Sequence, residues 1–400
     1  MKLYAQHGFQ PGKRITQGLA DGLIDGVIYS AKDTDPSRLE EVLRAQAPRS
    51  DRFLDPQYYA CIVATQPGAR LGWLLSEEDG YPYFRARRRA ELEREVNVQA
   101  DLEACIAFQA PLPLTAIIAP NIVIRRSFDS VEGTIAKDFI RNTAIVAQRI
   151  APGKPVYGTL AVSTAALGDR VELQNFLQEI TEIESPPVGL YLLLERPDQA
   201  IPVSLTEQDV LSRWMLINHT LKINGFKLIN GYTDGISPYI GAVGGDAVAS
   251  GWFNTLKAFS LKKFEPAVDQ FARRAVPRYT SKALLRSIRY TEFHDLRDTF
   301  PEVLNGRPTD AYFDKAEGSE PAEAAYEALQ NWDALRIMIS QCISGSVEDA
   351  LTNCHLALND AQDLYGRITG LGYTLRDRSS DAHIEPIRYE LKKFAELAEI

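Results

Sequence analysis

Short apolar runs alternate with longer amphipathic stretches over about the first 280 residues of this 400-residue chain. The alternation is typical of repeated βα units, whose parallel strands are buried on both faces by the helices that connect them. Eight such runs are present, the number that closes a (β/α)8 barrel of the TIM type. The predicted strands are residues 25–30, 52–55, 115–120, 156–162, 189–195, 226–232, 246–251 and 274–279.

The segments between these runs predict the outer helices. Apolar residues recur at helical spacing in residues 131–150 and 170–184, and Thr206 with Asp209 resembles an N-cap before a helix at 210–223. The interval at about residues 60–112 is far longer than a normal crossover. It predicts an insertion over the barrel mouth, between the second and third strands.

The strand signal stops at about residue 280, and the remainder is predicted to be helical. The chain is therefore predicted to hold a barrel domain over residues 1–300 and a helical C-terminal domain over 301–400, with a linker at 305–308. The C-terminal helices are predicted at residues 320–340, 346–369 and 383–399, separated by turns that contain glycine.

A formal net charge of -9 argues against a protein whose whole surface binds phosphates. Two local basic clusters remain. The cluster at residues 85–89 precedes acidic residues and is interpreted as a solvated helix start. The second cluster is predicted at the barrel mouth and has outward-facing strand residues as its alternative. It consists of Arg273, Arg274 and Arg278, with Lys262 and Lys263 upstream.

The cysteines and histidines form no recognisable metal or nucleophile motif. The four cysteines lack close pairs, and none of the five histidines has metal-ligand spacing or lies beside a nucleophile. No metal site is predicted, and no cofactor is identified. The chain also has no signal-peptide pattern and no run of apolar residues long enough for a membrane span, so a cytoplasmic location is expected.

The barrel prediction places a site at the C-terminal ends of the strands. Asp55 follows a predicted strand in the sequence LDPQYY and suits a general base or a hydrogen-bond acceptor. Its alternative is an Asp-Pro turn that caps backbone NH groups. Glu195 ends an apolar strand and is predicted as a second carboxylate, with an ion pair to Arg196 as its alternative. Asp234 is a further candidate for that partner role.

Further residues near the strand ends are predicted to bind substrate. The run at 230–252 is rich in glycine, so NH groups of Gly244 and Gly245 are candidates to hold a phosphate or a carbonyl oxygen, although tight packing explains the glycines equally well. Trp252 is a candidate for stacking on a flat ligand, or else a core residue. The remaining candidates are Gln57, Asn121, Asn230, Tyr232 and Asp246.

In layout, the first 280 or so residues resemble the tRNA-guanine transglycosylase superfamily. In that family an aspartate opens an Asp-Ser-Gly-Gly-Phe-Gln segment after the second strand and contacts the base. Here the segment from Asp55 to Tyr59 takes a similar place without the two glycines. Residues 248–255, the segment comparable to that of the family's nucleophile, contain no carboxylate, and the family's zinc ligands are missing. The resemblance implies the fold and a pocket sized for a base, and leaves base exchange open.

The sequence therefore leaves three functions open. The first is an enzyme that acts on a nucleobase, in a nucleic acid or a nucleoside, with Asp55 as base and Glu195 or Asp234 as its partner. The second is a barrel enzyme that acts on a small phosphorylated metabolite or sugar. The third is a non-catalytic scaffold whose C-terminal helices bind a protein partner or a second copy of the chain.

Overall fold

A parallel sheet of nine strands curves into a nearly closed barrel. The structure is a computed structural model that describes residues 1–76, 79–196, 209–267, 276–314, 324–376 and 378–400. The strand order is β3-β2-β1-β9-β8-β7-β6-β4. Both β4 and β5 pair with β6, so these two short strands occupy one position, and the nine strands fill eight barrel positions. The strands are β1 (Lys2–Gln6), β2 (Gly26–Ser30), β3 (Asp51–Asp55), β4 (Ile117–Ile118), β5 (Val123–Ile124), β6 (Val156–Ser163), β7 (Gly189–Glu195), β8 (Lys227–Gly231) and β9 (Ala247–Ser250).

The predicted fold class is confirmed, but one barrel position was missed and one was misassigned; β5, which shares its position with β4, was also not predicted. The barrel begins with β1, which pairs in parallel with both β2 and β9. The predicted last strand, 274–279, is wrong as a barrel strand: residues 274–275 lie outside the described ranges, and β10 (Arg278–Ser281) pairs only with β11 (Arg286–Arg289), in a separate antiparallel sheet. The two errors cancel in the count. β1 is short and contains Gln6, so its apolar signal is weak.

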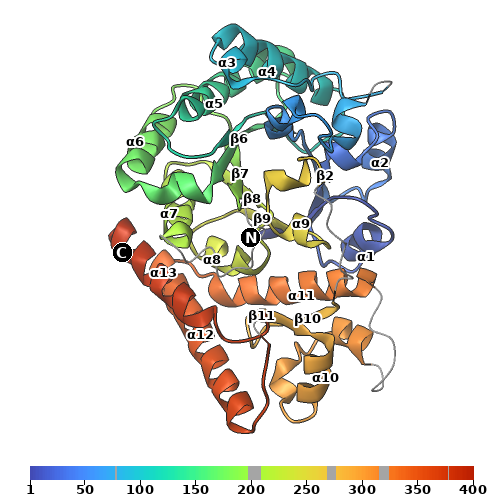
Figure 1. Ribbon diagram of the computed structural model, residues 1–400, viewed down its shortest axis with the longest axis vertical. Helices are drawn as coiled ribbons and strands as arrows, with labels where there is room; N and C mark the ends of the chain where they lie inside the picture. The colour runs from blue at the N-terminus through green and yellow to red at the C-terminus, as the bar shows by residue number, and fades with distance from the viewer. Residues whose placement is uncertain (77–78, 197–208, 268–275, 315–323, 377) are drawn as a thin grey trace.

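Helices follow the strands around the barrel (Figure 1). The bounds of α5 and α7 agree with the prediction. In α5 the Ser130 hydroxyl accepts the Gly133 NH at 3.2 Å. Thr206, the predicted cap of α7, lies outside the described residues, and the Asp209 side chain makes no capping bond. These helices are α1 (Arg14–Ala20), α2 (Leu39–Ala45), α4 (Glu95–Gln109), α5 (Val131–Ile150), α6 (Arg170–Thr181), α7 (Val210–Ile223) and α8 (Ser237–Ala242).

The eighth barrel helix is α11 (Ala324–Cys342), separated from β9 by more than seventy residues of chain. It packs between α8 and α1 and so completes the outer ring (Figure 1). The Trp332 indole NH donates to the Ser250 carbonyl at 2.9 Å, and the Arg336 guanidinium lies 2.8 Å from the Asp25 carboxylate. A helix predicted to belong to the C-terminal unit therefore takes a place in the barrel.

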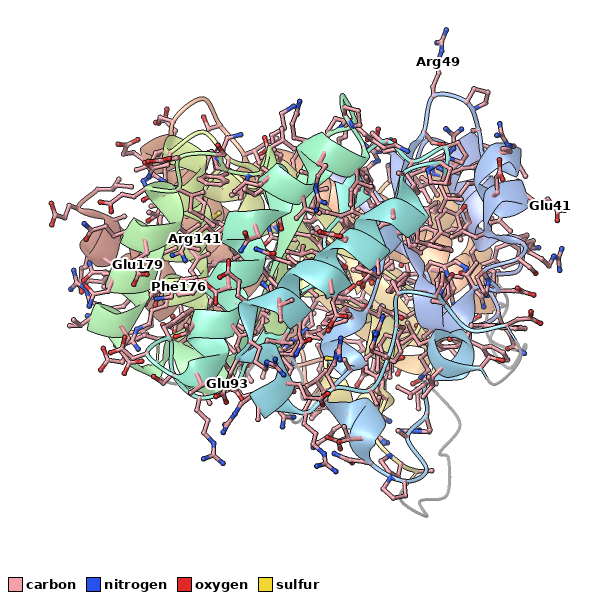
Figure 2. The ribbon with its side chains drawn as sticks, turned by 90° about the horizontal axis from the view of Figure 1, so that it is seen from above. Glu41, Arg49, Glu93, Arg141, Phe176 and Glu179 are labelled. Carbon is pink, nitrogen blue, oxygen red and sulfur yellow. The ribbon has the colours of Figure 1, made fainter. Side chains whose placement is uncertain are left out.

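The long interval after β3 contributes to the mouth and to the outer ring. Short 3-10 turns come first, and there the backbone NH of Arg70 donates to the Phe264 carbonyl at 2.8 Å, across to the segment that follows β9. After α3 (Arg89–Leu92), α4 packs along α5 as an ordinary outer helix (Figure 2). Glu93 projects from the end of α3 at the edge of this layer (Figure 2).

The last two helices, α12 (Val347–Gly370) and α13 (Ile384–Ala398), lie against the outside of the barrel (Figure 1). α12 packs on α8 and α11, and α13 packs on α7. The Glu390 carboxylate accepts the backbone NH of Ser212, in the first turn of α7, at 2.8 Å. One cluster of buried apolar side chains extends from Leu3 to Leu397. A domain boundary near residue 300 stays a prediction.

In the described ranges, no helix is both long enough and apolar enough to cross a membrane. A cytoplasmic location stays a prediction.

Candidate functional site

A buried carboxylate lies at the mouth of the barrel. Asp55 ends β3, and its side chain is fully buried. One carboxylate oxygen accepts the backbone NH of Gln57 at 3.0 Å. The other accepts the hydroxyl groups of Tyr59 at 2.8 Å and Tyr191 at 3.2 Å. This carboxylate therefore has donors from its own loop and from β7, on the other side of the barrel.

A lysine is linked to this carboxylate through a third tyrosine. The Lys263 ammonium donates to the Tyr232 hydroxyl at 2.7 Å, and that hydroxyl lies 3.5 Å from the Asp55 oxygen that Tyr59 and Tyr191 contact. Lys263 belongs to the segment that follows β9. We call Asp55, Tyr59, Tyr191, Tyr232 and Lys263 the carboxylate cluster.

Burial controls the protonation of this cluster. Desolvation raises the pKa of Asp55 above its usual value, while the Lys263 charge and the tyrosine hydrogen bonds lower it. Desolvation lowers the pKa of Lys263 to about 8, against the opposing attraction of Asp55 and Asp33. Burial also raises the pKa of all three tyrosines well above 10, so they remain hydroxyl donors. The cluster thus combines a carboxyl group whose pKa is raised with an amine whose pKa is lowered.

Local backbone geometry brings these side chains together. Gln57 and Tyr232 adopt left-handed backbone angles, with φ of 51° and 58°, directly after β3 and β8. On β8, Gly231 leaves space for the Tyr191 hydroxyl, because a Cβ atom there would lie 2.6 Å from that oxygen. Strand alternation places Phe53 below Asp55 on the inner face of β3, where its ring contacts Tyr4. The barrel is thus aromatic below and polar at the mouth.

Polar groups from β1 and β2 complete the rim. The Gln57 side-chain oxygen accepts the Ser30 hydroxyl at 3.1 Å and the Lys32 backbone NH at 2.8 Å. The Gln6 side-chain oxygen lies 3.4 Å from the Tyr191 hydroxyl, while its buried NH2 group has no hydrogen-bond partner in the described structure. Gln6 is therefore an unused donor beneath the carboxylate cluster.

A cavity of about 280 Å³ opens beside this cluster. Tyr59 lines it, so one residue of the carboxylate cluster is in contact with the cavity. Two arginines and one carboxylate give it polar character among apolar walls. Its lining residues are Tyr59, Ile62, Val63, Gln66, Arg89, Ala90, Val123, Arg125, Glu132 and Leu261.

Among the described residues, no hydrogen bond joins either of the other two predicted carboxylates to the carboxylate cluster. Glu195 is buried at the end of β7, where its backbone pairs with that of Phe259. Asp234 accepts the Ser250 hydroxyl at 2.7 Å and the Asn331 side-chain amide at 3.0 Å. It therefore joins β9 to α11, and no described hydrogen bond connects it to Asp55.

Three predicted ligand contacts lie at the opposite end of the barrel. Gly244 and Gly245 close α8, and their NH groups already donate to the carbonyls of Gly241 and Ile240. Asp246 precedes β9 and contacts the Lys222 ammonium and the Leu228 NH. Because β9 runs from this end toward the mouth, none of the three faces Asp55. The glycines serve the turn, with φ of 97° at Gly244.

Two predicted amide contacts point away from the mouth. The Asn121 side-chain NH2 donates to the carbonyls of Ala136, on α5, and Thr159. The Asn230 NH2 donates to Asn218 on α7 at 2.8 Å. Both join strands to outer helices. They are therefore placed among packing contacts rather than beside Asp55.

Of the predicted basic trio, only Arg278 belongs to the described residues. Arg278 lies in β10, where its guanidinium donates to the carbonyls of Ser287 and Arg378, and Arg273 and Arg274 lie outside the described residues. Trp252 does lie at the end of β9, but its ring packs at right angles to His7 and its NH donates to the Phe9 carbonyl at 3.0 Å.

Sequence reasoning placed Asp55, Gln57 and Tyr232 at one site, and the structure brings these three together. It missed Tyr59 and Tyr191 as members, and it named Lys263 at the mouth only as part of the basic patch. Tyr59 lies in the segment after the second predicted strand, four residues from Asp55. This short separation is the sequence feature that could have identified it as a neighbour of Asp55. No local signal marks Tyr191, because it lies inside an apolar strand and acquires its partner only when the barrel closes.

No group of three or more potential metal-ligating side chains occurs among the described residues. The four cysteines are free and buried.

No protein-family model and no curated protein matches the chain. A glycosyl hydrolase of the GH3 family from Mycobacterium smegmatis str. MC2 155 is similar to it in structure, at 12% identity over 83% of this chain and 94% of that one, with a TM-score of 0.38. Rhizobium etli pyruvate carboxylase is similar at 10% identity over 93% of this chain and 32% of its own length, with a TM-score of 0.34. At these scores, neither bears on function.

Proposed function

We propose that this chain is an enzyme that acts on a nucleobase, in a nucleoside or a nucleic acid, at the mouth of its barrel. One observation carries the proposal: Tyr59 lines the cavity and also donates to Asp55 at 2.8 Å. A substrate in the cavity is thereby connected to a buried carboxylate through one phenol group. In the base-exchanging transglycosylases that the chain is expected to resemble, an aspartate at this place contacts the base directly, whereas here Asp55 would act through Tyr59.

The composition of the cavity supports a flat heterocycle as the ligand. Ile62, Val123 and Leu261 offer apolar contacts, and the ring of Tyr59 offers a stacking surface. Arg125 and Glu132 supply a donor and an acceptor for the polar edge of a base. A volume of about 280 Å³ lies just below the usual range for ligand sites, about 300–1,000 Å³, which favours a single base over a larger cofactor.

In the proposed mechanism, the Tyr59 hydroxyl exchanges a proton with a ring nitrogen or an exocyclic oxygen of the base, and Asp55 exchanges a proton with Tyr59. Tyr191 and Tyr232 hold the carboxylate by hydrogen bonds to the same oxygen. The positive charge of Lys263 favours the ionised form of Asp55, which is the form that accepts a proton. Asp55 thus acts through Tyr59 and has no direct contact with the cavity.

The test is calorimetric titration with free bases and the corresponding nucleosides. If a base binds, we expect Tyr59→Leu to lower its affinity about tenfold or more, since stacking contributes about 1–3 kcal/mol. Tyr59→Phe keeps the ring and should retain binding while it abolishes turnover. Failure of every base and nucleoside to bind would contradict the proposal.

A second candidate substrate is a small phosphorylated metabolite, because Arg89 and Arg125 lie together in the cavity wall. Titration with sugar phosphates separates the two candidates. Binding of a sugar phosphate that Arg89→Ala and Arg125→Ala each weaken, together with no binding of bases, would favour this alternative.

A further inference from the structure

Lys263 carries a nucleophilic amine at the barrel mouth. In the function proposed above, it serves only through its positive charge, which favours ionised Asp55. Its ammonium group is enclosed by the rings of Tyr232, Phe264 and Phe259, at 4.5, 4.9 and 5.7 Å from the ring centres. Lys263 as a whole residue is only partly buried, whereas its ammonium group is buried. Its backbone and the start of its side chain therefore lie nearer the surface than the nitrogen.

The hydrogen-bonding capacity of this amine is largely unused. Among the described residues, its hydrogen-bond acceptor is the Tyr232 hydroxyl at 2.7 Å. An ammonium group has three donors, and the surrounding aromatic rings offer no acceptor oxygen apart from that hydroxyl. Two of its three donors therefore have no acceptor among the described residues.

Burial and the charges around Lys263 shift its pKa in opposite directions, and burial has the larger effect. Asp55 from β3 and Asp33 from the turn after β2 favour its charged form, whereas Lys32 and the loss of solvent disfavour it. Desolvation is the largest effect and lowers the pKa to about 8. At pH 7 roughly a tenth of the molecules then carry a neutral amine, the form that attacks carbonyl carbon, whereas an ordinary lysine has less than a thousandth.

We propose that Lys263 forms an imine with the carbonyl group of an aldehyde or ketone ligand at the barrel mouth, with Tyr232 and Asp55 as its proton relay. The geometry that supports this is the chain of contacts from the amine to the Tyr232 hydroxyl and on to the Asp55 carboxylate. The inference does not depend on the nature of the base or phosphate ligand proposed above.

The step balances without an oxidant or a reductant. The neutral amine adds to the carbonyl carbon, and the first of its two nitrogen protons passes through Tyr232 and Asp55 to the carbonyl oxygen, which becomes a hydroxyl group. The nitrogen then loses its second proton through Tyr232 to Asp55. That proton returns to the hydroxyl, which leaves as water while the carbon–nitrogen double bond forms. The products are one imine and one water molecule.

The experiment is reductive trapping on the intact chain with propanal and cyanoborohydride. The labelled protein is then digested, and the modified lysines are identified by peptide mass spectrometry. Lys262, on the same turn, is the internal reference. We expect Lys263 to be propylated at least about tenfold faster than Lys262 at pH 7.5, with a rate that rises through about pH 8. Equal labelling of the two lysines, or faster labelling of Lys262, would overturn the proposal.

Two variants test the relay separately. Tyr232→Phe retains the ring but loses the hydroxyl group, and we expect it to slow labelling of Lys263 on the order of tenfold or more. If this variant does not fold, as judged by circular dichroism, Asp55→Asn takes its place with the same expectation. Labelling at an unchanged rate in the folded variant would exclude the relay. Lys263→Arg should abolish labelling at this position, and persistence of the fast label in that variant would show that the modified residue was another one.

Discussion

At the scale of single residues, the central feature is a carboxylate removed from water. Burying a charge is costly unless hydrogen bonds and an opposite charge compensate. Asp55 has two tyrosine hydroxyls within 3.2 Å, one backbone NH at 3.0 Å and the Lys263 charge beyond Tyr232. These contacts favour its ionised form, whereas desolvation opposes it. The result is a group whose proton affinity depends on its neighbours, as catalytic acids and bases require.

The first prediction concerns the stability contributed by Lys263. Its pKa is about 8 in the folded chain and 10.5 for the free side chain, so between these pH values the unfolded chain binds one more proton. The free energy of unfolding therefore rises with pH over this window. We expect wild type to gain about 2 kcal/mol relative to Lys263→Met between pH 8 and pH 10.5, less than the full shift implies because the residue is partly exposed.

Urea denaturation at a series of pH values measures this difference. Lys262→Met is the matched control on the same turn, since it leaves the contacts of Tyr232 and Asp55 in place. If the difference in unfolding free energy between wild type and Lys263→Met stays constant from pH 8 to pH 10.5, the burial of the Lys263 amine is contradicted.

At the scale of elements, β7 and β8 must fit closely for Tyr191 to reach Asp55. The two strands pair in parallel, with Tyr191 opposite Ile229. Two residues further along β8, Gly231 faces the Tyr191 hydroxyl. A glycine inside a strand normally weakens it, so its presence here is explained by the approach of this side chain. The following helix, α8, supplies no contact to the carboxylate.

The second prediction follows from this fit. Gly231→Ala would place a methyl group 2.6 Å from the Tyr191 oxygen and 2.8 Å from a Leu193 methyl group, so we expect a loss of about 1–3 kcal/mol in unfolding free energy. In Tyr191→Phe the oxygen is absent, and Gly231→Ala should cost less in that background, with a favourable coupling of about 1 kcal/mol. Additive losses in this double-mutant cycle would show that the hydroxyl group is not the obstacle.

The third prediction tests α11 as the eighth barrel helix. Trp332 is fully buried against Gly18 of α1, and its NH donates to the carbonyl at the end of β9. We expect Trp332→Ala to lower the free energy of unfolding by about 3–5 kcal/mol in urea denaturation. Trp73→Ala, at a partly buried position, is the control and should cost less. Equal losses would argue against a close fit of α11 on the barrel.

At the scale of the whole molecule, barrel and C-terminal helices share their packing. α11 completes the ring, α13 covers α7, and the Glu390 carboxylate accepts an NH group at the start of α7. The hairpin of β10 and β11 is joined to α11 by the Thr280 NH, which donates to the Gln330 side chain at 2.9 Å. The buried apolar side chains form a single cluster.

The fourth prediction is that the chain unfolds in one cooperative transition. Removing the C-terminal helices from the barrel would expose α7, α8 and β9 together, so neither part has a complete core without the other. We expect the near-ultraviolet and far-ultraviolet circular dichroism signals to change at the same temperature. Two separate transitions would instead support independent domains divided near residue 300.

Much of the architecture is predictable from the sequence because it depends on local patterns. The bounds of β7, α5 and α7 follow from apolar runs and helical spacing, and these are read from neighbouring residues alone. Asp55 was predicted because a carboxylate before a proline at a strand end is a local feature. The glycines at 244 and 245 misled the prediction, since a turn and an anion site favour the same residue type.

By itself, the sequence determined the class of fold and Asp55 as a polar residue at the mouth, because hydrophobic periodicity and strand ends are set by residues close along the chain. Only the tertiary structure decided which eight runs form the barrel, that α11 is its eighth helix, and that Tyr191 and Lys263 join Asp55. Contacts between residues separated by up to about two hundred positions depend on how a closed sheet brings distant strands together, and no local pattern encodes that arrangement.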